Sequence, residues 1–200
     1  MPTLEAHELL LGQAGNGMLI TPREFDEGDF DDAWNYELVN GVLVVTPLPL
    51  RGETDPNDEL GYLLRNYQKN HSNGASLDLT LPEQHVRTKT SRRRADRLIW
   101  ANLGRKPRDH EKPTIVVEMV SARLRDFEMK REEYAAIGIR EYWVFDRFAR
   151  TLTVYTGRKI KGSVYRENDI NQTALLPGFE LPIKELLTRA DLWADESEEK

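Results

Sequence analysis

Two stretches of the chain decide its fold: Arg94-Ala95-Asp96-Arg97-Leu98-Ile99-Trp100 and Thr114-Ile115-Val116-Val117-Glu118-Met119-Val120. Both are short and largely apolar, which predicts two strands of a buried sheet. Each strand carries one carboxylate at a position where apolar residues dominate. Burying a carboxylate is costly unless a cation meets it. The two stretches therefore predict an α/β core and, within it, a site that attracts a cation.

A lysine follows the second strand. Lys130 ends the run Asp126-Phe127-Glu128-Met129-Lys130, where we expect Asp126 to cap a helix that stops at Gly138. If the two strands pair, Asp96 and Glu118 can meet on one face of the sheet, because side chains alternate along a strand. Two carboxylates and a lysine are suited to hold Mg²⁺ beside a phosphate and to stabilise the charge that develops there. This combination favours a metal-dependent phosphodiester hydrolase.

The predicted roles at this site are specific. Asp96 and Glu118 would bind Mg²⁺ or Mn²⁺, with the backbone carbonyl of Met119 as a further oxygen ligand. Lys130 would orient the attacking water or stabilise the pentavalent transition state. Alternatives from the pattern alone stay open: Asp96 in an ion pair with its arginine neighbours, Glu118 as a structural carboxylate, and Lys130 as a surface residue of its helix.

The rest of the pattern predicts one α/β domain with a mixed central sheet flanked by helices. We expect an extension over residues 1–20, the domain over residues 21–190, and an acidic tail over residues 191–200. The expected helices are a short one capped by a Thr21 and Glu24 capping box, a long one that starts at Asp55-Pro56, the one after Asp126, and residues 183–190. The expected strands are residues 36–39 and 42–45 around an Asn40-Gly41 turn, then 76–81, 85–88, 94–100, 114–121, 141–146, 151–156 and 163–166.

Composition bounds the class of protein. The chain has 200 residues, 39% of them hydrophobic, and no cysteine, which suits one packed domain without disulfides or thiolate metal ligands. The four histidines have no spacing typical of zinc ligands. No stretch reaches the ~18 apolar residues that a membrane span needs. We therefore expect a soluble, cytoplasmic protein without a membrane partner.

Charge is distributed unevenly along the chain. The net charge is −6, and acidic residues crowd residues 24–37 and the C-terminal tail. Residues 87–112 instead hold ten Lys or Arg against three acids. This basic segment surrounds Asp96, so we predict that Arg92, Arg93 and Arg94 contact the phosphate backbone of a nucleic acid. The alternative for most of these side chains is a solvated, arginine-rich loop.

Several pieces of the chain occur together in a known order. They are Tyr36 to Gly41, the Asp96 strand, Val117 to Ser121, Asp126 to Lys130, Tyr134, Gly138, Glu141 to Asp146, and Leu176 to Phe179. In these pieces the run from Tyr36 to Asp146 resembles the bacterial Uma-two family of restriction-type endonucleases, within the PD-(D/E)XK nuclease superfamily. The resemblance implies a restriction-endonuclease-like fold and metal-dependent cleavage of nucleic acid, with DNA as the expected substrate.

The resemblance also implies roles residue by residue. Asp96 is similar to the aspartate of the proline-aspartate element, and Glu118 to the acidic member of the second element. Val120 stands two residues after Glu118, so the lysine of the simple Glu-x-Lys pattern is absent from the strand, and Lys130 on the following helix takes its place. Glu37 matches an acidic residue that would be a further metal ligand or a base that orients water.

The sequence departs from the family in two places. Ala95 stands where a proline usually precedes the aspartate, a change that affects backbone stiffness and not chemistry. Many family members have a histidine at the start of the helix after Pro47, where this chain has Thr54, Asp55, Asn57 and Asp58. We expect this second departure to alter activity, metal choice or substrate range.

Two rival functions stay open at this stage. The negative net charge and the altered helix start favour a catalytically silent module that binds nucleic acid or protein on the same scaffold. An enzyme acting on a small phosphorylated substrate is the third possibility. Two symmetric sites in a homodimer would suit cleavage of two strands, but the sequence alone does not show a dimer.

Overall fold

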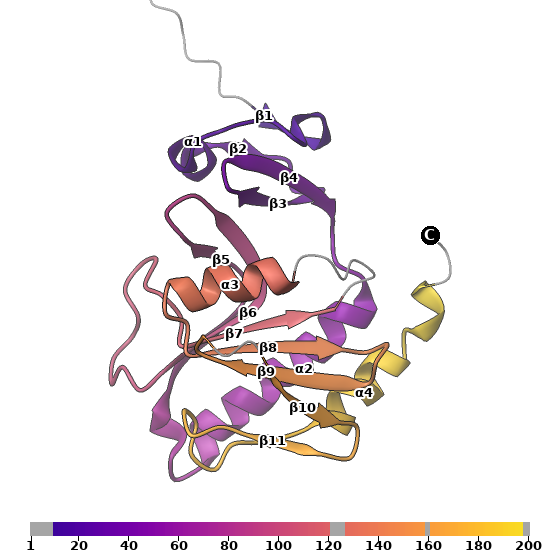
Figure 1. Cartoon of the computed structure of the whole chain (residues 1–200). Coiled ribbons are helices and arrows are strands. Elements are labelled where there is room, and N and C mark those ends of the chain that lie inside the picture. Colours follow the sequence, from indigo (N-terminus) through magenta and orange to yellow (C-terminus); the bar gives the residue numbers. More distant parts are fainter. Residues whose placement is uncertain (1–9, 121–126, 159–160, 198–200) are drawn as a thin grey trace, which may run out of the picture. The chain divides into compact units, whose positions relative to one another are not determined.

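The structure is a computed structural model that describes residues 10–120, 127–158 and 161–197. Its contacts divide the chain into two compact units. The first, called the hairpin unit, contains the chain up to Leu48 together with Arg87–Arg94; the second, called the sheet unit, contains Pro49–Val86 and the chain from Ala95 onward. Figure 1 labels the helices and strands of both units. The domain limits expected at residues 21 and 190 stay a prediction.

The hairpin unit is built around two antiparallel strands, β3 (Trp34–Val39) and β4 (Val42–Pro47). Asn40 and Gly41 join them with φ angles of 50° and 86°, the left-handed pair that a tight hairpin turn requires, so the predicted turn is confirmed. The short helix α1 (Pro22–Glu27) begins at Thr21 with the predicted capping box to Glu24. The unit also contains β1 (Leu10–Leu11), the 3-10 helix η1 (Gln13–Gly15) and β2 (Asp29–Phe30).

Residues 17–20 are attached to this hairpin. Leu43 exchanges backbone hydrogen bonds with the segment, donating to Met18 and accepting from Gly17, and the Ile20 amide donates to Gly41. Residues 17–20 of the expected N-terminal extension therefore pair with β4 and the hairpin turn. The hydrophobic core of the hairpin unit consists of Phe25, Tyr36, Leu38 and Leu43.

The sheet unit contains five strands in the order β10-β9-β8-β7-β6, with β5 pairing to β6. Their bounds are β5 (Leu77–Arg87), β6 (Arg92–Ala101), β7 (Ile115–Met119), β8 (Glu141–Asp146), β9 (Thr151–Thr156) and β10 (Ser163–Arg166); β5 and β6 reach into the hairpin unit at Arg87 and Arg92–Arg94. The β7 and β8 strands are parallel, whereas β6 with β7, β8 with β9, and β9 with β10 are antiparallel. The predicted mixed sheet is confirmed.

Helices cover both faces of this sheet (Figure 1). On one face lie α2 (Arg51–Asn70) and α4 (Ile183–Asp191), whose Leu60, Leu64 and Leu187 pack with alternate residues of β7. On the other face lies α3 (Phe127–Ala136), whose Tyr134 packs with Val116. Two short antiparallel strands, β11 (Ile170–Gln172) and β12 (Glu180–Pro182), and the 3-10 helices η2 (Gly74–Ser76) and η4 (Ala194–Ser197) complete the unit. Within the described residues, no helix has the length and apolar character needed to cross a membrane.

The start of α2 was predicted wrongly. The Asp55-Pro56 pair was expected to open this helix, but α2 begins at Arg51, and Pro56 lies inside it. The Glu53 side chain explains the earlier start, because it accepts a hydrogen bond from the Leu50 amide and so satisfies a donor at the helix N-terminus. Leu60 and Leu64 on this helix are fully buried.

The structure joins two predicted strands into one and confirms a predicted helix end. The pieces expected at residues 76–81 and 85–88 form one strand, β5, because Glu83 takes a φ angle of 52° that bends the strand without ending it. Gly138 ends α3 as predicted, at a φ of 79°, with the Ile139 amide donating to the Tyr134 carbonyl. The expected cap, Asp126, lies outside the described residues, as does Ser121.

Gly61 on α2 gives a stability prediction. Replacing a helical glycine with alanine normally stabilises a protein by about 0.5–1 kcal/mol. At Gly61, however, the added Cβ would lie 2.6 Å from Nη2 of the Arg97 guanidinium, a side chain that is buried and hydrogen-bonded. We therefore expect Gly61→Ala to lower the free energy of unfolding by about 1–3 kcal/mol in a urea titration. The exposed Asn66→Ala on the same helix is the control, and stabilisation by Gly61→Ala would contradict this packing.

Candidate active site

Glu118 lies on the face of β7 that α3 covers. Along this strand Ile115, Val117 and Met119 belong to the α2 face, whereas Val116 belongs to the α3 face. By the same alternation Glu118 points toward α3, where only 4% of the residue is exposed. A carboxylate at such a depth needs polar partners from the covering helix.

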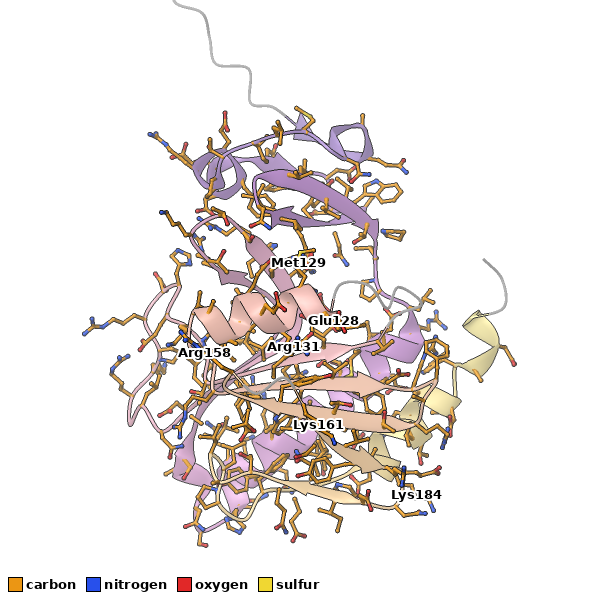
Figure 2. The ribbon with its side chains drawn as sticks, in the orientation of Figure 1. Glu128, Met129, Arg131, Arg158, Lys161 and Lys184 are labelled. Carbon is orange, nitrogen blue, oxygen red and sulfur yellow. The ribbon has the colours of Figure 1, made fainter. Side chains whose placement is uncertain are left out.

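Two side chains of α3 supply these partners. The Lys130 ammonium group donates to Glu118 Oε2 at 3.0 Å, and the Tyr134 hydroxyl donates to Glu118 Oε1 at 3.1 Å. Lys130 is 7% exposed and Tyr134 is fully buried, while their helix neighbours Glu128 and Met129 are exposed (Figure 2). Residues 130 and 134 are one helical turn apart, so both can reach the same carboxylate. The arrangement is a buried ion pair with an additional neutral donor.

Asp96 lies beside Glu118 in the next strand. Strands β6 and β7 are antiparallel with Arg97 opposite Val117, and this register sets Asp96 opposite Glu118. Asp96 also shares a strand face with Leu98 and Trp100, which pack on the α3 side. Its Oδ2 atom accepts a hydrogen bond of 2.5 Å from the Met119 amide, which fixes the direction of the carboxyl group.

The electrostatics of Asp96 are unusual. Burial raises the pKa of its carboxyl group well above the ordinary 3.8, and the negative charges of Glu118 and then Glu83 raise it further. The Met119 amide and the Lys130 charge act in the opposite direction on this pKa but do not cancel the rise. The Asp96 carboxyl group therefore keeps its proton to a higher pH than an ordinary aspartate does. A perturbed carboxyl group of this kind is typical of functional sites.

The structure thus brings Asp96, Glu118 and Lys130 to one face of the sheet. Their catalytic and metal-binding roles stay predictions. The other residues predicted for the site, Glu37 and Arg92–Arg94, belong to the hairpin unit.

Acidic groups contact all three of these arginines. Arg92 is 8% exposed and donates from Nε and Nη2 to the two carboxylate oxygens of Asp26 at 2.8 Å. Arg93 is 1% exposed and pairs with Glu37 Oε2 at 3.3 Å, while Glu37 Oε1 accepts from the Arg94 amide at 2.9 Å. These contacts give Arg92, Arg93 and Glu37 a structural role in the hairpin unit. Binding of nucleic acid by the arginines is untested.

The sequence predictions missed three residues beside the site. The family resemblance includes Tyr134 but implies no role for it, although its spacing of four from Lys130 indicates a shared target. The negative charge of Glu83 on β5 raises the pKa of Asp96. Glu83 also has a left-handed φ of 52°, which its neighbours in the sequence do not predict. Asn57 donates from Nδ2 to the Asp96 carbonyl at 2.8 Å, and only the fold brings these residues together.

The residues present fit a hard divalent cation. Mg²⁺ commonly takes one or two carboxylates and keeps several waters. Asp96 and Glu118 supply such a pair, and their mutual repulsion is what a cation would relieve. Among the described residues there is no group of three or more His, Cys, Asp or Glu that could hold a metal ion. Two carboxylates, with the remaining positions left to water, would suit Mg²⁺ or Mn²⁺.

A mixed sheet between helices, with paired carboxylates and a lysine on one face, defines the restriction-endonuclease-like class of nuclease folds. Residues 22–184 match the family model Uma2, described as "Putative restriction endonuclease", and the chain belongs to this family. A crystal structure from Anabaena variabilis, described as "a putative nuclease belonging to DUF820", superimposes with a TM-score of 0.72. The superposition covers 86% of this chain and 99% of that one at 14% identity, so it shows a shared fold. No curated protein matches the chain in sequence.

Proposed function

We propose that the protein is a divalent-metal-dependent endonuclease that hydrolyses phosphodiester bonds in DNA. The observation that carries this proposal is the contact of Lys130 with Glu118 at 3.0 Å on the strand face that also holds Asp96. Membership of the Uma2 family supports the nuclease class. Metal dependence and the DNA substrate are the parts of the proposal that need experiment.

In this reaction, different residues of the chain would bind the metal, orient the carboxylates and stabilise the developing charge. Asp96 and Glu118 would hold Mg²⁺ or Mn²⁺, which when bound polarises a phosphate oxygen and lowers the pKa of a coordinated water. The Met119 amide and the Tyr134 hydroxyl hold the two carboxylates in fixed directions. The Lys130 ammonium group adds positive charge at the place where negative charge develops during hydrolysis, and burial strengthens this interaction.

Removing the metal gives the first test. We expect the purified chain to nick supercoiled plasmid DNA with Mg²⁺ or Mn²⁺ and to lose at least about 10³-fold in rate with excess chelator, because metal ions contribute several kcal/mol to such reactions. Adding the metal back should restore the rate, which excludes irreversible damage. The measurement is the rate of conversion of supercoiled to open-circular plasmid.

The pairing of Arg92 and Arg93 with acidic residues favours one alternative function, a catalytically silent binding module. A catalytically silent binding module would bind DNA or a protein without cutting it, and the net charge of −6 agrees with a weak contact to nucleic acid. Binding of plasmid without nicking under every metal condition would favour this module. Failure to bind any nucleic acid would instead direct attention to small phosphorylated substrates.

A further inference from the structure

A buried polar cluster joins α2 to the strand that carries Asp96. Its members are Asn57 on α2, Arg97 on β6 and Thr80 on β5, which are 3%, 3% and 1% exposed. Arg97 follows Asp96 directly, so its side chain points to the opposite, α2 face of the sheet. The cluster and the candidate active site therefore lie on opposite faces of the sheet around the same stretch of β6.

The hydrogen bonds of the cluster meet at Asn57. Arg97 donates from Nε to Asn57 Oδ1 at 2.7 Å, from Nη2 to the Asn57 carbonyl at 2.8 Å, and from Nη1 to Thr80 Oγ1 at 3.3 Å. Asn57 Nδ2 in turn donates to the Asp96 carbonyl at 2.8 Å. Guanidinium groups only donate and carbonyl groups only accept, so chemistry fixes which end of the amide faces each partner.

This cluster offers Arg97 neutral partners. Burial lowers the pKa of Arg97 to about 10, although the acidic groups nearby act against this change. Gly61 is required beside it, because a Cβ there would lie 2.6 Å from Nη2. The α2 helix thus packs closely against the buried guanidinium group of Arg97. The Asn57 amide of this helix donates to one peptide of β6 and holds that peptide in a single orientation.

We propose that Asn57, held by Arg97, is a positioning residue for Asp96 in the nuclease reaction. The inference rests on the proposed function and deepens it. Asn57 fixes the Asp96 peptide from the α2 face, and the Met119 amide of the neighbouring strand β7 fixes the Asp96 carboxyl group. Asp96 is thus held at both its backbone and its side chain, which is what a carboxylate that must meet a metal or a phosphate at a fixed position requires.

The test replaces the amide donor and keeps the shape. Asn57→Asp retains an acceptor for Arg97 but sets an oxygen against the Asp96 carbonyl. Asn66→Asp is the matched control, because Asn66 is exposed on the same helix and accepts a hydrogen bond from Asn70. Asn57→Ser, which is smaller and uncharged, is the second variant if the aspartate prevents folding.

Two measurements decide the inference. In the metal-free protein, the Met119 amide proton, which donates to Asp96 Oδ2, should move upfield in Asn57→Asp and stay in place in Asn66→Asp. With metal, kcat for plasmid nicking should fall about 10–100-fold with KM changed less than about 2-fold, because loss of a supporting partner costs this much. Thermal unfolding must show both variants folded at the assay temperature.

The outcomes separate this inference from the function on which it rests. An active wild type with equal kcat in Asn57→Asp and Asn66→Asp, or with an unmoved Met119 amide proton, overturns the positioning role alone. A wild type that cuts no DNA overturns the proposed nuclease and the positioning role of Asn57 together. A fall in kcat that only follows the unfolded fraction also overturns the inference.

Discussion

Asp96→Asn is expected to reduce the rate of metal-dependent nicking on the order of 10³-fold or more, while the metal-free protein becomes more stable. The loss of activity follows from the loss of one of two carboxylate ligands, since metal ions contribute several kcal/mol and each 1.36 kcal/mol changes a rate tenfold. The gain in stability follows from burial and from the repulsion of Glu118 and Glu83, both of which raise the pKa of Asp96 in the folded protein. Asparagine keeps the shape and removes the charge.

The sign of the pH dependence follows from proton binding. The pKa of Asp96 is higher in the folded protein than the ordinary 3.8, so between these two values the folded state binds more protons than the unfolded state. In that range the stability of the wild type falls as pH rises. Asp96→Asn removes this penalty. Its gain in unfolding free energy should therefore be absent below pH 3.8, grow as pH rises through the folded pKa, and be complete above it.

Thermal unfolding in chelator across this pH range, with nicking rates in metal, checks both halves of the prediction. Asp78→Asn is the control, because the Asp78 carboxylate also accepts a backbone hydrogen bond, from Leu103, but has no proposed role in catalysis. Wild-type activity in Asp96→Asn would exclude Asp96 as a ligand. Lower stability at neutral pH would show that the charge of Asp96 is already compensated in the folded protein.

Much of the fold could be predicted because its signals are local. The Asn40-Gly41 turn, the Thr21 capping box and the Gly138 helix end each depend on a few neighbouring residues, and each occurs as predicted. The wrong start of α2 is also decided locally. Pro56 suggested a helix start, but Glu53 had already satisfied the Leu50 amide, and the helix therefore began earlier.

The candidate site could be predicted only in part. Strand alternation and the pairing of β6 with β7 bring Asp96 and Glu118 to one face, which periodicity predicts, and Lys130 follows Glu118 on the predicted helix. Glu83 and Asn57 reach the site from strand and helix positions 13 and 39 residues before Asp96, so no spacing in the sequence indicates them. Arg92 and Arg93 were chosen for their charge, but burial and pairing with Asp26 and Glu37 depend on tertiary contacts.

Lys130→Met should have the second largest effect, because the ammonium charge that it removes contributes to both stability and catalysis. Without the ammonium group, the Glu118 carboxylate loses its ion-pair partner while only 4% of the residue is exposed to solvent. Breaking a buried ion pair on one side costs about 3–5 kcal/mol of unfolding free energy. Loss of one group that stabilises transition-state charge lowers the rate about 10²–10³-fold. The exposed Lys184→Met on α4 is the control for loss of a positive charge (Figure 2).

The double variant Glu118→Gln with Lys130→Met separates the two effects. It removes both charges, so neither is left buried beside a neutral partner, and we expect most of the lost stability to return in a urea titration. Activity should not return, because the double variant lacks a metal ligand as well as the ammonium group. Recovery of stability without activity would show that the fold tolerates a neutral pair at this position and that the reaction requires the charged one. Independent, additive losses of stability would contradict the ion pair, and nicking at the wild-type rate by Lys130→Met would remove the lysine from the mechanism.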